Sequence, residues 1–231
     1  MLSRAVAAVS AGLSAIANWR FFKPAVFLAC LAPGAMLGYE AWQTFGGSDP
    51  GALGADPASA LLHQTGKTAL TILLVTLTVT PLRRIFSVNR LQLVRRMLGV
   101  WAFTYALIHL SLYLTLDQLC FSLATCEFAA IWADLVKRPF IFVGQLAFVI
   151  LLLLAITSTN GWTRRLRKNW ARLHRLAYVA AVAGVVHFIW IQKAGIREPL
   201  PYLIWLAVVL GVRVYYVLQR RRLRSGSPVT A

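Results

Sequence analysis

The sequence predicts an all-α integral membrane protein, a bundle of six transmembrane helices. Of its 231 residues, 59% are hydrophobic and only 13% are charged, and the mean hydropathy is +0.67. A soluble domain of this length normally carries about a quarter charged residues. Six apolar runs, separated by polar segments, approach the roughly 20 residues that an α-helix needs to cross a bilayer.

Charge divides sharply between alternate segments. The net charge is +17, yet all seven acidic residues fall in three segments that hold only five of the 24 basic residues. These acids are Glu40, Asp49 and Asp56, then Asp117, Glu127 and Asp134, then Glu198. The division follows the positive-inside pattern, so we expect both chain ends in the cytoplasm. Membrane topology thus accounts for the positive charge, and we expect no nucleic-acid partner.

The expected organisation is a cytoplasmic N-terminal segment (1–23), a membrane domain (24–218) and a basic cytoplasmic tail (219–231). Residues 1–18 imitate a signal peptide that ends in a cleavage-like Ala15-Ile-Ala17 triplet. Cleavage would leave Arg20 and Lys23 on the outer side, against the positive-inside rule, so we expect the segment to be retained.

The spans are expected at about residues 24–39, 66–82, 97–116, 140–157, 173–190 and 200–218. Pro33-Gly34 predicts a kink in the first span, and the Gly-, Pro- and Asp-rich stretch 40–65 predicts a loop. Pro81 marks the end of the second span. Residues 117–138 are interpreted as an outer loop with a short surface helix.

Two of the four histidines lie inside spans, His109 in the third and His187 in the fifth. Each lies thirteen residues beyond the basic edge of its span, marked by Arg96 and His174, which is roughly 20 Å at the rise of an α-helix. The two rings are therefore expected at one depth. Intramembrane histidines indicate function, and two facing imidazoles suit the axial positions of haem iron. Hydrogen-bonded packing is the alternative.

Small residues near these histidines, Gly99 and Gly184 among them, leave room for a flat macrocycle or serve close helix packing. His174 lies at the cytoplasmic edge, where it ligates a second haem or contacts headgroups. Arg95 shares the face of His109 and stands where a partner ligand for that haem is expected. Thirteen residues turn a straight helix by about 220°, so His174 and His187 face different ways unless the helix bends.

His63, at the outer end of the second span, is interpreted as a surface residue, a quinone or flavin contact, or a docking residue. Cys120 and Cys126 share an outer loop and form a disulfide if that side is oxidising. Cys30 is expected to be a buried thiol. Neither a GxGxxG after a strand nor a P-loop occurs, so no nicotinamide- or nucleotide-binding domain is expected.

Several blocks carry a resemblance to a known family. They are Leu53-Gly-Ala-Asp-Pro57, His63-Gln-Thr-Gly-Lys-Thr-Ala-Leu70, Thr80-Pro-Leu-Arg83, Arg95-Arg-Met-Leu-Gly-Val-Trp-Ala-Phe-Thr-Tyr-Ala-Leu-Ile-His109, Arg138-Pro-Phe140, Thr157-Ser-Thr159, Trp170-Ala-Arg-Leu-His-Arg-Leu-Ala-Tyr178 and His187-Phe-Ile-Trp190. In this order they resemble the MsrQ (YedZ) family, haem-bearing membrane subunits within the ferric-reductase-like transmembrane superfamily.

The resemblance implies b-type haem, one or two, with His109, His187 and His174 as axial ligands, and an associated FMN. It implies an electron-transfer subunit of the bacterial inner membrane, supplied by the quinone pool or a cytosolic flavin reductase. The implied acceptor is MsrP, a periplasmic molybdoenzyme that reduces methionine sulfoxide in oxidised proteins. Arg95 departs from the NADPH oxidases of the superfamily, which have a fourth histidine there, and we expect no counterpart of their dehydrogenase domain.

Two alternatives stay open on the sequence. One is a stand-alone ferric or cupric reductase that needs no protein acceptor. The other is a haem-free transporter or scaffold whose histidines bind substrate or pack, although transporters more often show paired broken helices.

Overall fold

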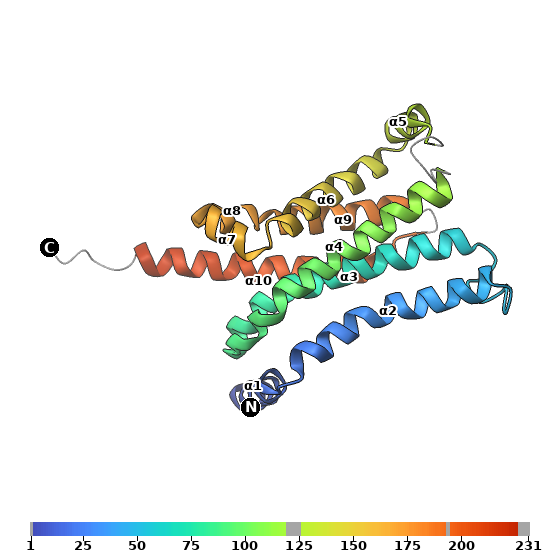
Figure 1. Cartoon of the computed structure of the whole chain (residues 1–231). Coiled ribbons are helices and arrows are strands. Elements are labelled where there is room, and N and C mark those ends of the chain that lie inside the picture. Colours follow the sequence, from blue (N-terminus) through green and yellow to red (C-terminus); the bar gives the residue numbers. More distant parts are fainter. Residues whose placement is uncertain (1, 119–125, 193–194, 226–231) are drawn as a thin grey trace.

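The computed structural model (Figure 1) describes residues 2–118, 126–192 and 195–225, and over these residues it is helical without strands. The helices are α1 (Leu2–Asn18), α2 (Phe22–Phe45), α3 (Pro57–Phe86), α4 (Gln92–Leu112), α5 (Phe128–Lys137), α6 (Pro139–Ile156), α7 (Asn160–Leu166), α8 (Lys168–Leu173), α9 (Leu176–Ile191) and α10 (Leu200–Ser225), with short turns η1 (Asn89–Leu91) and η2 (Tyr113–Asp117). Six helical stretches of the described chain are long and apolar enough to cross a membrane, which confirms the expected fold class.

The predicted bounds of the loop at 40–65 are wrong at both ends. The helix α2 continues to Phe45, and α3 already begins at Pro57. Asp56 caps α3, because its carboxylate accepts a hydrogen bond from the Ser59 amide at 3.1 Å, and proline suits the first helical position that follows. This Asp-Pro-x-Ser pattern is itself a helix-start signal in the sequence.

Two helix pairs form the centre of the bundle. The most extensive contacts are those of α3 with α4 and of α6 with α9, while α2 and α10 pack outside them (Figure 1). Ala102 of α4 and Ala180 of α9 are fully buried, and such small residues let membrane helices approach closely. The core also contains Leu74 and Leu77 of α3.

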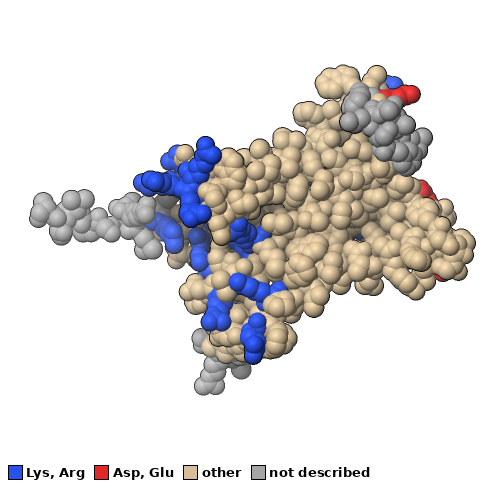
Figure 2. Space-filling view, in the orientation of Figure 1, with Lys and Arg blue, Asp and Glu red and all other residues tan. Residues whose placement is uncertain are grey.

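The two ends of the bundle differ in charge. Figure 2 shows Lys and Arg gathered at the end that carries α7, α8 and the C-terminal part of α10, with Asp and Glu at the opposite end. Helix α1 lies at the basic end, where Ser10 donates a hydrogen bond to the Phe86 carbonyl at 3.1 Å. The N-terminal segment is therefore packed on the membrane domain.

Tyr105 of α4 anchors α2 beside Pro33. In an undisturbed helix the Gly34 amide pairs with the Cys30 carbonyl four residues earlier. Here the Tyr105 hydroxyl of α4 lies between them, accepting from Gly34 N at 2.8 Å and donating to Cys30 O at 2.7 Å. A Cβ atom at position 34 would lie 2.8 Å from this hydroxyl, so the glycine is needed for the approach. Such an insertion is a recognised cause of a helix bend.

We expect Tyr105→Phe to lower the free energy of unfolding by about 1–3 kcal/mol, because it leaves a buried amide and carbonyl without their partner. Denaturant titration in detergent micelles measures the change. Tyr39→Phe is the matched control, since this exposed hydroxyl accepts only a 3.3 Å bond from Gln43 on its own helix. Equal effects of both substitutions would contradict the anchoring role.

Candidate functional site

A cavity of about 560 Å³ lies between the two central helix pairs, α3–α4 and α6–α9. Its walls are mostly apolar, with Leu70, Leu73, Phe148 and Leu151 among the lining residues. Cavities of this size and character are typical of sites for small molecules and cofactors. His109 and His187 both line it.

Each of these histidines is fixed by a backbone carbonyl of the neighbouring helix. His109 Nδ1 donates to the Leu62 carbonyl of α3 at 2.9 Å, and His187 Nδ1 donates to the Phe140 carbonyl of α6 at 2.7 Å. A carbonyl only accepts, so the proton of each neutral ring is on Nδ1 and the Nε2 lone pair is free. Such an outer hydrogen bond is the usual support of a metal-bound imidazole.

Two glycines make these bonds possible. Gly66 and Gly144 each follow the accepting carbonyl by four residues, on the same helix face. A Cβ atom would lie 3.1 Å from His109 Cε1 at position 66, and 2.8 Å from His187 Cε1 at position 144. Neither glycine was predicted from the sequence, although a glycine inside a helical pattern is a signal of close approach.

The two half-sites are copies of one arrangement. His109 and His187, Leu62 and Phe140, and Gly66 and Gly144 are each separated by 78 residues, as are the buried Ala102 and Ala180. Helix pair α3–α4 therefore corresponds to pair α6–α9. The repeat was not predicted from the sequence, because only a handful of positions carry it.

The two rings face one another across the cavity. Their centroids are 6.4 Å apart and their planes make an angle of 83°, so the fold brings the two rings close together. His109 and His187 are the two residues that would hold a metal at this site, each through its Nε2 atom. No cluster of three or more His, Cys, Asp or Glu side chains occurs in the described ranges, so a metal here needs its remaining ligands from a bound group. Haem supplies such ligands, and the cavity and donors fit it.

Gly184 lines this cavity, but Gly99 and Arg95 do not. The nearest neighbour of a Cβ at Gly99 would be Thr76 of α3 at 4.0 Å, so Gly99 serves helix packing. A role for Gly99 in the surroundings of a haem stays a prediction. Arg95 lies toward the basic end, where its charge acts on His174 and Arg213. A role for Arg95 beside a second haem stays a prediction.

His174 lies apart from the paired histidines. The fifth span is interrupted there, since α8 ends at Leu173 and α9 begins at Leu176. The His174 ring stacks on Trp170 at 3.9 Å, and its Nδ1 donates to the Trp170 carbonyl at 3.1 Å. Its Nε2 is buried without a hydrogen-bond partner in the described structure. The Leu154 backbone also interacts with this ring. A ligand role for His174 stays a prediction.

His63 lies on the rim of the cavity. Its Nε2 donates to a Glu198 carboxylate oxygen at 2.8 Å, and Gln192 and Lys67 approach the same oxygen at 3.0 and 3.8 Å. This cluster ties α3 to the loop between α9 and α10. Cys126, elsewhere on the acidic side, is disulfide-bonded, whereas Cys120 lies outside the described residues, and Cys30 is a buried free thiol.

The fold and the site together define a multi-pass membrane bundle with an apolar cavity lined by two histidines. Residues 65–185 match the family "Ferric reductase like transmembrane component". A relative from Xanthomonas euvesicatoria pv. vesicatoria (strain 85-10) is 49% identical over 201 residues, 87% of this chain and 88% of the relative. One from Caulobacter vibrioides is 41% identical over 203 residues, 87% and 89% of the two chains. Both are named protein-methionine-sulfoxide reductase heme-binding subunit MsrQ. The chain belongs to the MsrQ family, within the ferric-reductase-like transmembrane proteins.

The Glu198 cluster predicts a pH dependence of stability. The hydrogen bond from His63 and the charge of Lys67 lower the pKa of Glu198 below its ordinary value of 4.5. A carboxylate whose pKa is depressed by folding stabilises fully above its unfolded pKa and loses this contribution as pH falls through the folded pKa. Above pH 4.5 we expect the wild type to melt at a higher temperature than Glu198→Gln. The difference should be small, because the Glu198 side chain is exposed. Melting curves from about pH 7 to about pH 3 measure the difference. A gap that stays constant into strong acid would contradict the assignment.

Proposed function

We propose that this chain holds b-type haem between His109 and His187 and carries electrons to the periplasmic molybdoenzyme MsrP for repair of methionine sulfoxide in oxidised proteins. The observation that carries the proposal is the pair of imidazoles, 6.4 Å apart, each held by Nδ1 with Nε2 free. The name of the relatives supports haem as the bound group.

The protein contributes position and environment. Haem supplies reversible one-electron chemistry at iron when bound. The carbonyls of Leu62 and Phe140 hold the imidazole rings in place and increase their basicity as ligands. Leu70, Phe148 and other apolar residues exclude water from the cavity. Lys67 and Arg138 are the basic residues of the described lining, near its acidic end, and would hold the haem carboxylates.

The direction of transfer follows from the charge of the two ends. We assign the basic end of the bundle to the cytoplasm, because Lys and Arg gather there (Figure 2). Residues 1–23 and 219–231 then lie on the cytoplasmic side, and residues 24–218 form the haem domain. Electrons then enter from the quinone pool or a cytosolic flavin reductase, with FMN as an associated cofactor and His174 as ligand of a second haem. They leave at the acidic end, nearest His109 and His187.

The first test is a reduced-minus-oxidised visible spectrum with haem quantification per chain. We expect a six-coordinate b-type haem that His109→Ala and His187→Ala each remove, and any second haem should remain in both variants. His174→Ala, the matched control at the other end, should leave the haem between His109 and His187 in place. Full haem content in either of the first two variants would overturn the site. Reduction of ferric or cupric ions without MsrP would favour the stand-alone reductase, and absence of haem would favour a transporter or scaffold.

Gly144→Ala tests the geometry without touching a ligand. The new Cβ would lie 2.8 Å from His187 Cε1 and displace the ring. We expect the content of the haem between His109 and His187 to fall by more than half, or this haem to become five-coordinate, as judged from the spectrum. Gly211→Ala is the control, because a Cβ there meets nothing within 4 Å. A wild-type spectrum for Gly144→Ala would contradict the role of this glycine in seating the His187 ring.

A further inference from the structure

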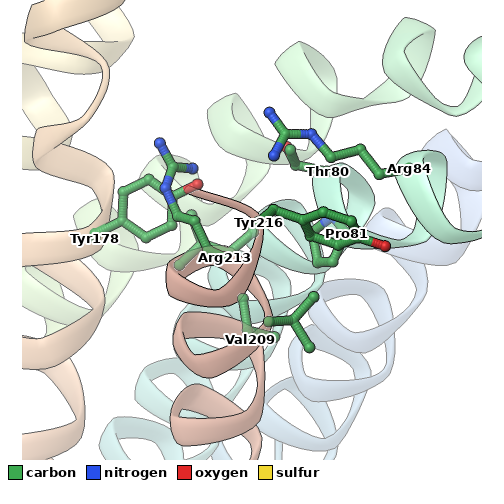
Figure 3. Close-up of a pocket in the computed structure, with 9 residues that line it drawn as sticks. Thr80, Pro81, Arg84, Tyr178, Val209, Arg213 and Tyr216 are labelled. Atoms are coloured by element: carbon green, nitrogen blue, oxygen red, sulfur yellow. The ribbon is translucent and has the colours of Figure 1, made fainter. Parts of the chain in front are cut away.

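A second, much smaller pocket lies at the basic end of the bundle, away from the paired histidines. It is lined by α3, α9 and α10, with Thr80, Arg84, Tyr178, Arg213 and Tyr216 around it (Figure 3). Its volume of about 10 Å³ accommodates a single group the size of a water molecule. The pocket cannot hold a macrocycle, but one oxygen of a larger anion fits.

The pocket carries positive charge without a counter-charge. The Arg213 guanidinium lies over the Tyr178 ring, 4.0 Å from its centroid, and that of Arg84 lies 5.8 Å from the Tyr216 centroid (Figure 3). Neither arginine has a carboxylate partner within the described ranges. Arg213 also experiences the like charges of Arg84, Arg95 and Arg175. Such repulsion at the edge of a low-dielectric region is relieved by a bound anion.

Thr80 supplies an independent sign of a ligand. The five other threonines of α3 donate their hydroxyl protons to the carbonyl four residues earlier; they are Thr65, Thr68, Thr71, Thr76 and Thr78. The Thr80 hydroxyl is buried and has no partner in the described structure. Thr80 and Arg84 are four residues apart on α3, and both line the pocket (Figure 3). Buried polar atoms in proteins almost always have a hydrogen-bond partner. A bound ligand with an oxygen atom in the pocket would supply one for the Thr80 hydroxyl.

We propose that this pocket binds a phosphate group, with Arg84 and Arg213 on its charged oxygens and Thr80 donating to one of them. Guanidinium groups match phosphate in geometry and charge. The phosphate belongs to a phospholipid headgroup or to a soluble phosphate ester such as FMN. Basic pockets between membrane helices are suited to anionic headgroups. This proposal does not depend on haem.

The two sources are distinguished by thermal-shift titration of the delipidated full-length protein in neutral detergent. The probes are short-chain phosphatidylglycerol, FMN, inorganic phosphate, and a short-chain diacylglycerol that lacks the phosphate. Saturable stabilisation by phosphatidylglycerol alone identifies a lipid headgroup, and stabilisation by FMN identifies a soluble ester. Stabilisation by none of the phosphates, or equal stabilisation by diacylglycerol, would overturn the proposal.

A charge-matched pair of double variants tests the location. We expect Arg84→Gln with Arg213→Gln to weaken phosphate binding at least about tenfold, because two charge-assisted hydrogen bonds are lost. Arg90→Gln with Arg164→Gln removes the same charge from exposed residues outside the pocket and should change the affinity less than about twofold. Equal weakening in both would show general attraction to a basic surface and overturn the site.

Thr80→Val tests the site without a change in charge. We expect opposite effects on the stability of the free protein and on its affinity for the phosphate. Without ligand, the variant should melt at the same or a higher temperature than the wild type, because an unpaired buried hydroxyl is replaced by a methyl group. Its affinity for the stabilising phosphate should fall about threefold or more. An unchanged affinity would overturn the role of Thr80.

Discussion

Two hydrogen bonds, from His109 Nδ1 to the Leu62 carbonyl and from His187 Nδ1 to the Phe140 carbonyl, determine the rest of the site. Each ties one helix of a central pair to the other and sets which ring nitrogen is protonated. An intramembrane imidazole is expensive unless its N–H has a partner. At Leu62 and Phe140 the ring reaches a helical carbonyl because Gly66 and Gly144, four residues later, have no side chain. The glycines, the close approach of the helices and the free Nε2 atoms follow from this one requirement.

The same solution occurs twice, 78 residues apart, and the cavity lies where the two copies face one another. The remaining helices support this core. Tyr105, one turn before His109 on α4, holds α2 through its interrupted turn at Cys30 and Gly34. Helix α4 thus carries both His109, which lines the cavity, and Tyr105, which anchors α2. A substitution of Tyr105 therefore changes the packing of α4 one turn from the cavity.

Charge separates two kinds of site along the membrane normal. Toward the acidic end, an apolar cavity with two neutral imidazoles suits a flat cofactor that exchanges electrons. At the basic end, a pocket too small for such a cofactor carries Arg84 and Arg213 without carboxylates in the described structure and suits an anion. His63 and Glu198 close the acidic rim with an exposed pair that is sensitive to pH.

The sequence determined the six spans, the two charged ends and the common depth of His109 and His187, because hydropathy, charge and helical rise are local properties. It did not determine which way each side chain faces, since the rotation of a helix about its axis is set by its neighbours. Only the tertiary structure therefore placed Gly99 and Arg95 outside the cavity lining and brought Gly66 and Gly144 against the imidazoles. It also decided that the two rings face one another, because this depends on the packing of α4 on α3 and of α9 on α6.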